Sequence, residues 1–152
     1  MELILWRHAE AEDSTPKGDL ARELTKKGRR QAEQMAEWLR PRLDGEWRVL
    51  ASPAARALQT VAPLGLGYEV RPALDPFHSA ADLLREVAWP DGDRVIAVGH
   101  NPTFGEAAAQ LMGGDDSEVN FRKGAVWWFA TRERDGHTET LLKVVMTPEM
   151  TR

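Results

Sequence analysis

Three apolar runs in the first hundred residues constrain the fold of this chain more than any other feature. We expect them to form strands over residues 2–6, 47–51 and 94–99, and segments with helical spacing lie between them. Apolar runs that alternate with helices are typical of a parallel sheet covered on both faces. The carboxyl ends of parallel strands meet at one edge, where open α/β sheets bind their ligands. The residues that follow the three runs are therefore the first candidates for a functional role.

Each run is followed by residues that can bind an anion. Arg7 and His8 follow the first run, Arg56 follows the second after Ser52-Pro53, and His100 follows the third. Arginine presents planar pairs of donors that match phosphate oxygens, and a neutral imidazole can attack phosphorus. A second imidazole opposite the first would stabilise charge on the phosphoryl oxygens. Two arginines and two histidines at one edge thus predict a site for a phosphoryl group.

The segments between and after these runs predict the remaining elements. Thr25 suits the N-cap of a long helix that Pro41 ends or kinks, and Ser52 with Pro53 suits the N-cap and first position of a second helix. We expect further helices from residue 79 or 82 to 88 and from 102 to 112, a short strand over 68–70, and a hairpin of strands over 124–131 and 140–146 around Asp135-Gly136. The run over 94–99 is apolar throughout its centre and should be central in the sheet.

Composition limits the kind of protein that this chain can be. Its 152 residues suit one domain with a full-sized core, expected over residues 1–152. The absence of cysteine excludes disulfides, thiolate catalysis and cysteine-ligated metals, and fits a cytoplasmic protein. A net charge of -4 argues against nucleic-acid binding. The first residues are too short and too acidic for a signal peptide, and no run is long enough to span a membrane.

Four cations crowd the first turns of the helix that follows Thr25, namely Lys26, Lys27, Arg29 and Arg30. The helix dipole disfavours positive charge at that end. Two interpretations remain open: the cations form a solvated face, or they form a docking patch for an acidic partner.

The order and spacing of the motifs resemble the histidine phosphatase (phosphoglycerate mutase-like) superfamily. Arg7-His8-Ala9 is similar to the Arg-His-Gly signature of that superfamily, with alanine at the third position. The stretches over 24–28, 52–60 and 98–102 are similar to the start of its first helix and to its second and third signatures. The resemblance runs from residue 1 to about residue 102.

The resemblance implies a role for each of the four residues. His8 is expected to be the phosphorylated nucleophile. Arg7, Arg56 and His100 are expected to form the catalytic phosphate-binding pocket around it.

The resemblance also implies the fold. We expect a three-layer α/β/α sandwich with a mixed, mostly parallel sheet of about six strands, one of them antiparallel. Ser52 and Asn101 should support the site or form its turns. Neither a metal nor an organic cofactor is implied.

One departure from the superfamily pattern bears on the substrate. Many members carry a glutamate general acid in a Leu-x-Glu setting after the third strand, whereas here Leu74 is followed by Asp75 and Pro76. Asp75 and His78 are either substitutes for that acid or turn residues. An alkoxide leaving group needs a proton donor, whereas the P–N bond of phosphohistidine is labile. The missing acid and the short chain favour the compact SixA-type phosphohistidine phosphatases, with a phosphorylated protein as partner.

Two other functions stay open. A small-molecule phosphomonoesterase or mutase on the same fold would be favoured by a working acid at Asp75 or His78. A non-catalytic module that binds phosphate is the other alternative. No nucleic-acid or membrane partner is expected.

Overall fold

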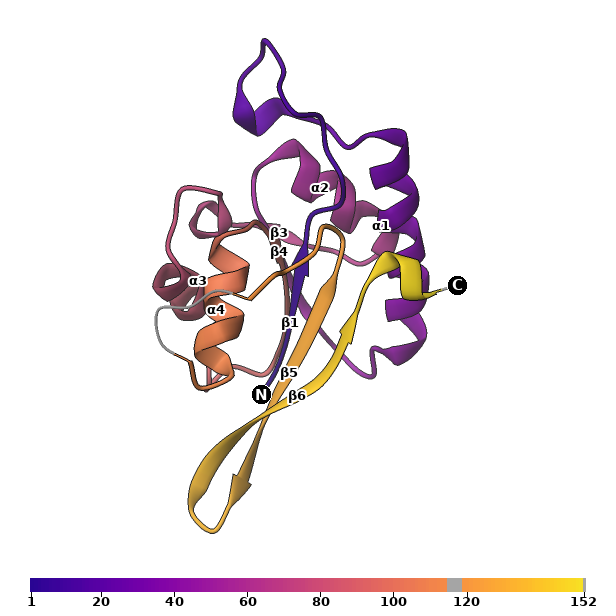
Figure 1. Ribbon diagram of the computed structural model, residues 1–152. Helices are drawn as coiled ribbons and strands as arrows, with labels where there is room; N and C mark the ends of the chain where they lie inside the picture. The colour runs from indigo at the N-terminus through magenta and orange to yellow at the C-terminus, as the bar shows by residue number, and fades with distance from the viewer. Residues whose placement is uncertain (115–118, 152) are drawn as a thin grey trace.

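The computed structural model describes residues 1–114 and 119–151, which form a six-stranded sheet with helices on both sides (Figure 1). The strands are β1 (Glu2–Arg7), β2 (Arg48–Ala51), β3 (Glu69–Val70), β4 (Arg94–Gly99), β5 (Val126–Arg134) and β6 (His137–Met146). Their order is β3-β2-β4-β1-β5-β6. The first four strands are parallel, and β5 and β6 are antiparallel to their neighbours. The predicted mixed sheet is confirmed, with β4 inside it as expected.

The α-helices of the described chain cover both faces of this sheet. They are α1 (Lys26–Leu39), α2 (Ala55–Val61), α3 (Ala80–Glu86) and α4 (Thr103–Leu111). Side chains of a strand point alternately to opposite faces. Ile4 and Trp6 of β1 therefore pack with α1 and α2, whereas Leu3 and Leu5 pack with α3 and α4 (Figure 1). The three-layer sandwich is confirmed, and no helix in its described part is long and apolar enough to cross a membrane.

The hairpin turns at Asp135-Gly136, as predicted. Both residues have positive φ angles, 52° and 78°, which a two-residue hairpin turn of this kind requires. The strands are longer than the sequence pattern indicated, because pairing continues up to Arg134 and His137 beside the turn. His137, the first residue of β6, is exposed.

The start of the second helix differs from the prediction. α2 begins at Ala55 with Ala54 at the N-cap position, so Ser52 is not the N-cap and Pro53 is not in the first turn. The Ser52 Oγ instead accepts a hydrogen bond from the N–H of Ala54 at 3.1 Å. Ser52-Pro53 is therefore a turn before the helix, and this turn keeps the Ser52 hydroxyl at 2.7 Å from His100 Nε2.

α1 packs directly on the backbone that follows His8. Thr25 caps this helix as predicted, since its Oγ1 accepts from the N–H of Gly28 at 3.0 Å. The N–H of Glu10 donates to Gln31 Oε1 at 3.0 Å, and the Glu10 carbonyl accepts from the N–H of Thr25 at 3.1 Å. A Cβ atom at Gly28 would lie 1.9 Å from the Glu10 carbonyl oxygen. The missing side chain at Gly28 thus permits the contact that fixes the chain after His8.

We therefore expect Gly28→Ala to destabilise the protein, although alanine at an open helix position is favoured over glycine by about 1 kcal/mol. The added methyl group must displace either the Glu10 carbonyl or α1. Urea unfolding followed by circular dichroism should give a lower midpoint for Gly28→Ala. The exposed Glu33→Ala in the same helix serves as the control. A midpoint that rises for Gly28→Ala would contradict the close contact.

Candidate active site

The carboxyl ends of the parallel strands bring the four predicted residues to one edge of the sheet. The N–H of His8 donates to the carbonyl of Gly99 at 2.9 Å, so the chain after β1 lies beside the end of β4. The ring centroids of His8 and His100 are 5.1 Å apart. Arg7 is the last residue of β1, and Arg56 comes from the first turn of α2, where it is 2% exposed.

The His8 ring is held as a neutral imidazole. Its Nδ1–H donates to the carbonyl of Ala9 at 2.7 Å, since a carbonyl oxygen can only accept. Burial lowers the pKa of His8 to about 3, against the opposing effect of the bond to Ala9, and the charges of Arg56, Arg7 and Arg22 lower it further. At neutral pH Nε2 therefore carries a lone pair, which is the state that a nucleophile needs.

His100 is a second neutral ring beside the first. Burial lowers its pKa to about 2, and the charges of His8, Arg56 and other nearby cations act in the same direction. Its Nε2 lies 2.7 Å from Ser52 Oγ, and its buried Nδ1 has no hydrogen-bond partner among the described residues. A negatively charged phosphoryl group beside this ring would raise its pKa and make it a charged donor.

Two guanidinium groups are held by backbone carbonyls. Arg7 Nη1 donates to the carbonyl of Phe121 at 2.6 Å, and Asn101 Nδ2 donates to the same oxygen at 3.1 Å. Arg56 Nη1 donates to the Asp19 carbonyl at 2.9 Å, and its Nη2 donates to the Asp19 carboxylate at 3.2 Å. The Nε atoms of both arginines are buried without a partner in the described part of the chain. Such donors are suited to the oxygens of a bound anion.

A third guanidinium group, that of Arg22, lies near the two rings. Its charge adds to the effect of burial in lowering the pKa values of His8 and His100. Its Nε is 3.1 Å from Asp19 Oδ1, so a single carboxylate pairs with both Arg22 and Arg56. Asp19 lies in the short turn η1 (Asp19–Ala21), in a loop after β1 that projects from the sheet (Figure 1). No sequence pattern pointed to either residue, because an acid and a base three apart are common in polar loops.

Asp75 and His78 form a turn that is tied to the start of α4. Asp75 Oδ1 accepts from the N–H of Phe77 at 2.8 Å and lies 2.7 Å from His78 Nδ1. The His78 carbonyl accepts from Thr103 Oγ1 at 3.0 Å. The hydrogen bond to Asp75 raises the pKa of the partly exposed His78 ring. Asp75 is thus a turn residue, while an acid role for either side chain stays a prediction.

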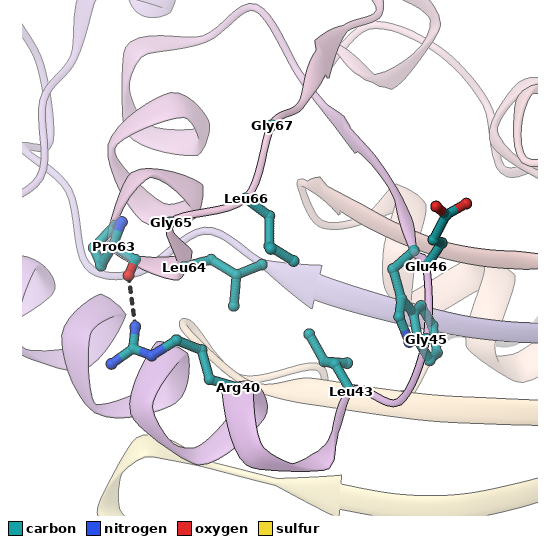
Figure 2. A pocket seen from close by; sticks show the side chains of 10 residues that line it. Arg40, Leu43, Gly45, Glu46, Pro63, Leu64, Gly65, Leu66 and Gly67 are labelled. Atoms are coloured by element: carbon teal, nitrogen blue, oxygen red, sulfur yellow. Dashed lines mark hydrogen bonds between the residues drawn. The ribbon is translucent and has the colours of Figure 1, made fainter.

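A separate pocket of about 740 Å³ lies at the opposite end of the sheet, where α1 ends and β2 begins (Figure 2). Leu43, Leu64 and Leu66 face one another in it. Arg40 donates to the carbonyl of Pro63 at 2.7 Å beside them. None of the residues around His8 lines this pocket.

The fold and the edge of the sheet define a class of protein. Two neutral imidazoles among three guanidinium groups, at the carboxyl end of parallel strands, suit an α/β/α enzyme that transfers phosphoryl groups through histidine. In residues 1–114 and 119–151, no three metal-ligating side chains lie close enough together to hold an ion.

Comparison with known proteins identifies the family. The profile of the histidine phosphatase superfamily (branch 1) matches residues 3–91. A phosphohistidine phosphatase SixA homolog of Haemophilus influenzae is 32% identical over 130 residues, which cover 74% of this chain and 78% of that protein. The chain therefore belongs to the histidine phosphatase superfamily, and it is a phosphatase.

The chain is also similar to two further proteins. The structure of the protein histidine phosphatase SixA complexed with tungstate superimposes with a TM-score of 0.80 at 26% identity and covers 100% of both chains. An uncharacterized protein of Mycobacterium tuberculosis is 34% identical over 118 residues, covering 74% of this chain and 75% of that protein.

The two buried histidines predict a loss of stability in acid. Their pKa values in the folded protein, about 3 and about 2, lie below the value near 6.5 of an unfolded chain, so the unfolded state binds protons first as the pH falls. The contribution of these rings to the free energy of unfolding is fully present above about pH 6.5. Below that pH it falls by up to about 1.4 kcal/mol per pH unit for each ring. In urea titrations between about pH 6.5 and 4, His100→Asn should therefore lose stability less steeply than the native protein.

The control for this experiment is His137→Asn, because His137 is exposed in the hairpin. It should keep the native pH dependence. Equal slopes for native protein and His100→Asn would contradict a buried neutral ring at position 100.

Proposed function

We propose that this phosphatase hydrolyses phosphohistidine on another protein through a covalent phospho-His8 intermediate. The observation that carries the proposal is the hydrogen bond from His8 Nδ1 to the Ala9 carbonyl, which leaves Nε2 unprotonated next to three guanidinium groups. The cytoplasmic location expected from the sequence remains a prediction.

The first step is attack on the phosphohistidine phosphorus. The His8 Nε2 lone pair forms a bond to phosphorus, the P–N bond of the substrate breaks, and the leaving imidazole takes a proton from solvent. Arg7, Arg22 and Arg56 stabilise the charge on the phosphoryl oxygens, and His100 can become a cationic donor as that charge approaches. The Nδ1–H of His8 stays on the Ala9 carbonyl throughout.

The second step regenerates the enzyme. Water attacks the phosphorus of phospho-His8, the P–Nε2 bond breaks, and inorganic phosphate leaves. The proton from the attacking water passes to solvent. His8 returns to the same neutral tautomer because its other nitrogen never loses the proton that it donates to Ala9.

The choice of phosphohistidine rests on the leaving group. Asp75, the residue nearest in sequence to the expected general acid, uses its carboxylate for the N–H of Phe77 and for His78. A phosphohistidine imidazole leaves without a strong acid, whereas an alkoxide requires one. One similar protein is a phosphohistidine phosphatase SixA homolog, and the protein histidine phosphatase SixA binds tungstate, a tetrahedral oxyanion like phosphate.

A second candidate, hydrolysis of a small phosphoester, is favoured by one observation. Asp75 raises the pKa of His78, so this ring carries a proton at higher pH than an ordinary histidine. In this second candidate, a protonated His78, whose carbonyl accepts from Thr103 Oγ1 at the start of α4, would donate a proton to the alkoxide.

The test measures phosphate release from a phosphohistidine protein, from p-nitrophenyl phosphate and from glycerol phosphate. We expect His8→Ala to lower the rate on phosphohistidine by about a thousandfold or more, because it removes the nucleophile. The exposed His137→Ala should retain the native rate. The native enzyme incubated with labelled substrate should carry label that acid releases and alkali does not, the stability expected of phosphohistidine.

Each contrary outcome is informative. Efficient turnover of glycerol phosphate with little release from phosphohistidine would replace the proposal by the small-molecule reaction. Full activity of His8→Ala would remove the covalent intermediate. Binding of inorganic phosphate without turnover of any substrate would leave a module that only binds phosphate.

A further inference from the structure

A cluster of exposed cations lies beside the active site. It consists of Lys27 and Arg30 from α1 and of Arg122 and Lys123 from the segment before β5, and we call these four residues the basic rim. All four side chains are exposed, and none forms an ion pair with a described residue. By contrast, Arg29 of the same helix lies 3.7 Å from Glu23 and is not included.

The four cations form one continuous surface although they come from distant parts of the sequence. Two neighbouring shallow hollows share Lys27, Gln31 and Glu149 in their walls. Arg30 lines the first of these hollows, and the cations at 122 and 123 line the second. The rim is therefore a single patch and not two separate pairs.

Carboxylates offset only part of the charge of the rim. Glu10 and Glu149 are the acidic side chains in the walls of the two hollows. The Glu10 carboxylate accepts a hydrogen bond from Thr25 Oγ1 at 2.7 Å. Hydrogen bonds to its own N–H and to Thr147 lower the pKa of Glu149, and the charges of Arg122 and Lys27 lower it further. Among the described residues, the walls of the two hollows thus hold four cations and two carboxylates, on a protein whose net charge is -4.

The rim is connected to the catalytic residues through the backbone. The carbonyl of Phe121, next to Arg122, accepts from Arg7 Nη1 at 2.6 Å. The N–H of Gly124, next to Lys123, donates to the His8 carbonyl at 3.0 Å. On the α1 side, Gly28 touches the chain just after Ala9. The rim therefore lies on segments that contact the backbone on either side of His8.

We propose that the basic rim docks an acidic surface that flanks the phosphohistidine of the partner protein. This inference rests on the proposed function. The protein as a whole carries a net charge of -4, so a local cluster of cations favours encounters in which an acidic surface meets this side of the molecule. The rim does not resemble a surface for single-stranded nucleic acid, because no aromatic residue lines either described hollow.

The test compares two double variants that change the net charge equally. Lys27→Glu/Lys123→Glu alters the rim, whereas Arg85→Glu/Arg134→Glu alters α3 and the far end of the hairpin (Figure 1). The substrates are an acidic protein and a basic protein, both phosphorylated on histidine with phosphoramidate, and free phosphohistidine. None of the four substituted residues contacts His8 or His100 in the described hydrogen bonds.

We expect the rim variant to lower kcat/KM on the acidic protein by about tenfold or more, with a weaker dependence on salt than the native enzyme shows. Its kcat/KM on free phosphohistidine should stay within about twofold of native, because rim charges act on encounter and not on chemistry. The Arg85→Glu/Arg134→Glu variant should match the native enzyme on every substrate. The native enzyme should prefer the acidic protein to the basic one.

Failure of the docking proposal is distinguishable from failure of the proposed function. If the native enzyme cleaves both phosphoproteins equally, or the two double variants behave alike, docking at the rim is wrong and the reaction stands. If the native enzyme cleaves no phosphohistidine substrate, both proposals fall. A third outcome is that the rim binds a single-stranded oligonucleotide while the rim substitutions leave the rate on the acidic protein unchanged. That result would overturn docking of an acidic protein and identify the rim as a nucleic-acid surface.

Discussion

The hydrogen bond between His8 Nδ1–H and the Ala9 carbonyl is the interaction on which the proposed chemistry depends. The donor and the acceptor belong to adjacent residues. The hydrogen bond therefore keeps its geometry only if the turn after β1 is rigid. The N–H of Ala9 donates to Thr60 Oγ1 at 3.0 Å, and that hydroxyl donates to the carbonyl of Arg56 at 2.7 Å. The turn that holds the proposed nucleophile and the helix that carries Arg56 are therefore joined through a single threonine.

The Ala9 side chain explains why alanine is accepted where the superfamily signature has glycine. It is fully buried and packs with Leu24 and Ala32. The methyl group thus contributes to the contact between the turn and α1. At Gly28 of α1 the absence of a side chain is what allows the contact, because it leaves room for the Glu10 carbonyl. Small residues on both sides of this contact let α1 fix the chain that follows His8.

Much of the fold was predictable because it depends on local patterns. Buried strands followed by Arg7-His8 and His100 placed both rings at one edge, and β1 and β4 are indeed neighbours. The helix start at Ser52 was mispredicted, because a serine before proline favours a turn as well as a cap, and the hydrogen bond to Ala54 N–H decides between them. Asp19 and Arg22 were not found, since a loop has no periodicity that reports where its side chains point. The basic rim shows the same limit, since no sequence pattern indicates that Arg122 and Lys123 lie beside the cations at the start of α1.

Electrostatic preorganisation unites these features. Arg22 and Arg56 both form ion pairs with Asp19, a residue of the loop after β1. These ion pairs hold the two guanidinium groups in place before a substrate binds. Burial and the guanidinium charges together keep His8 unprotonated. A phosphoryl group would then meet fixed donors and a free lone pair, which lowers the cost of reorganisation during the reaction. In the proposed reaction, the three arginines whose charges lower the pKa of His8 are also the ones that bind the phosphoryl oxygens.

The protonation state and tautomer of His8 are measured most directly by a pH titration of ¹⁵N-histidine-labelled protein by NMR, with His8→Asn used to assign the His8 ring. We expect a neutral His8 with the proton on Nδ1 from pH 8 down to about pH 4, and protonation only as the pH approaches its pKa of about 3. A His8 ring that titrates near pH 6.5, or that carries its neutral proton on Nε2, would contradict it.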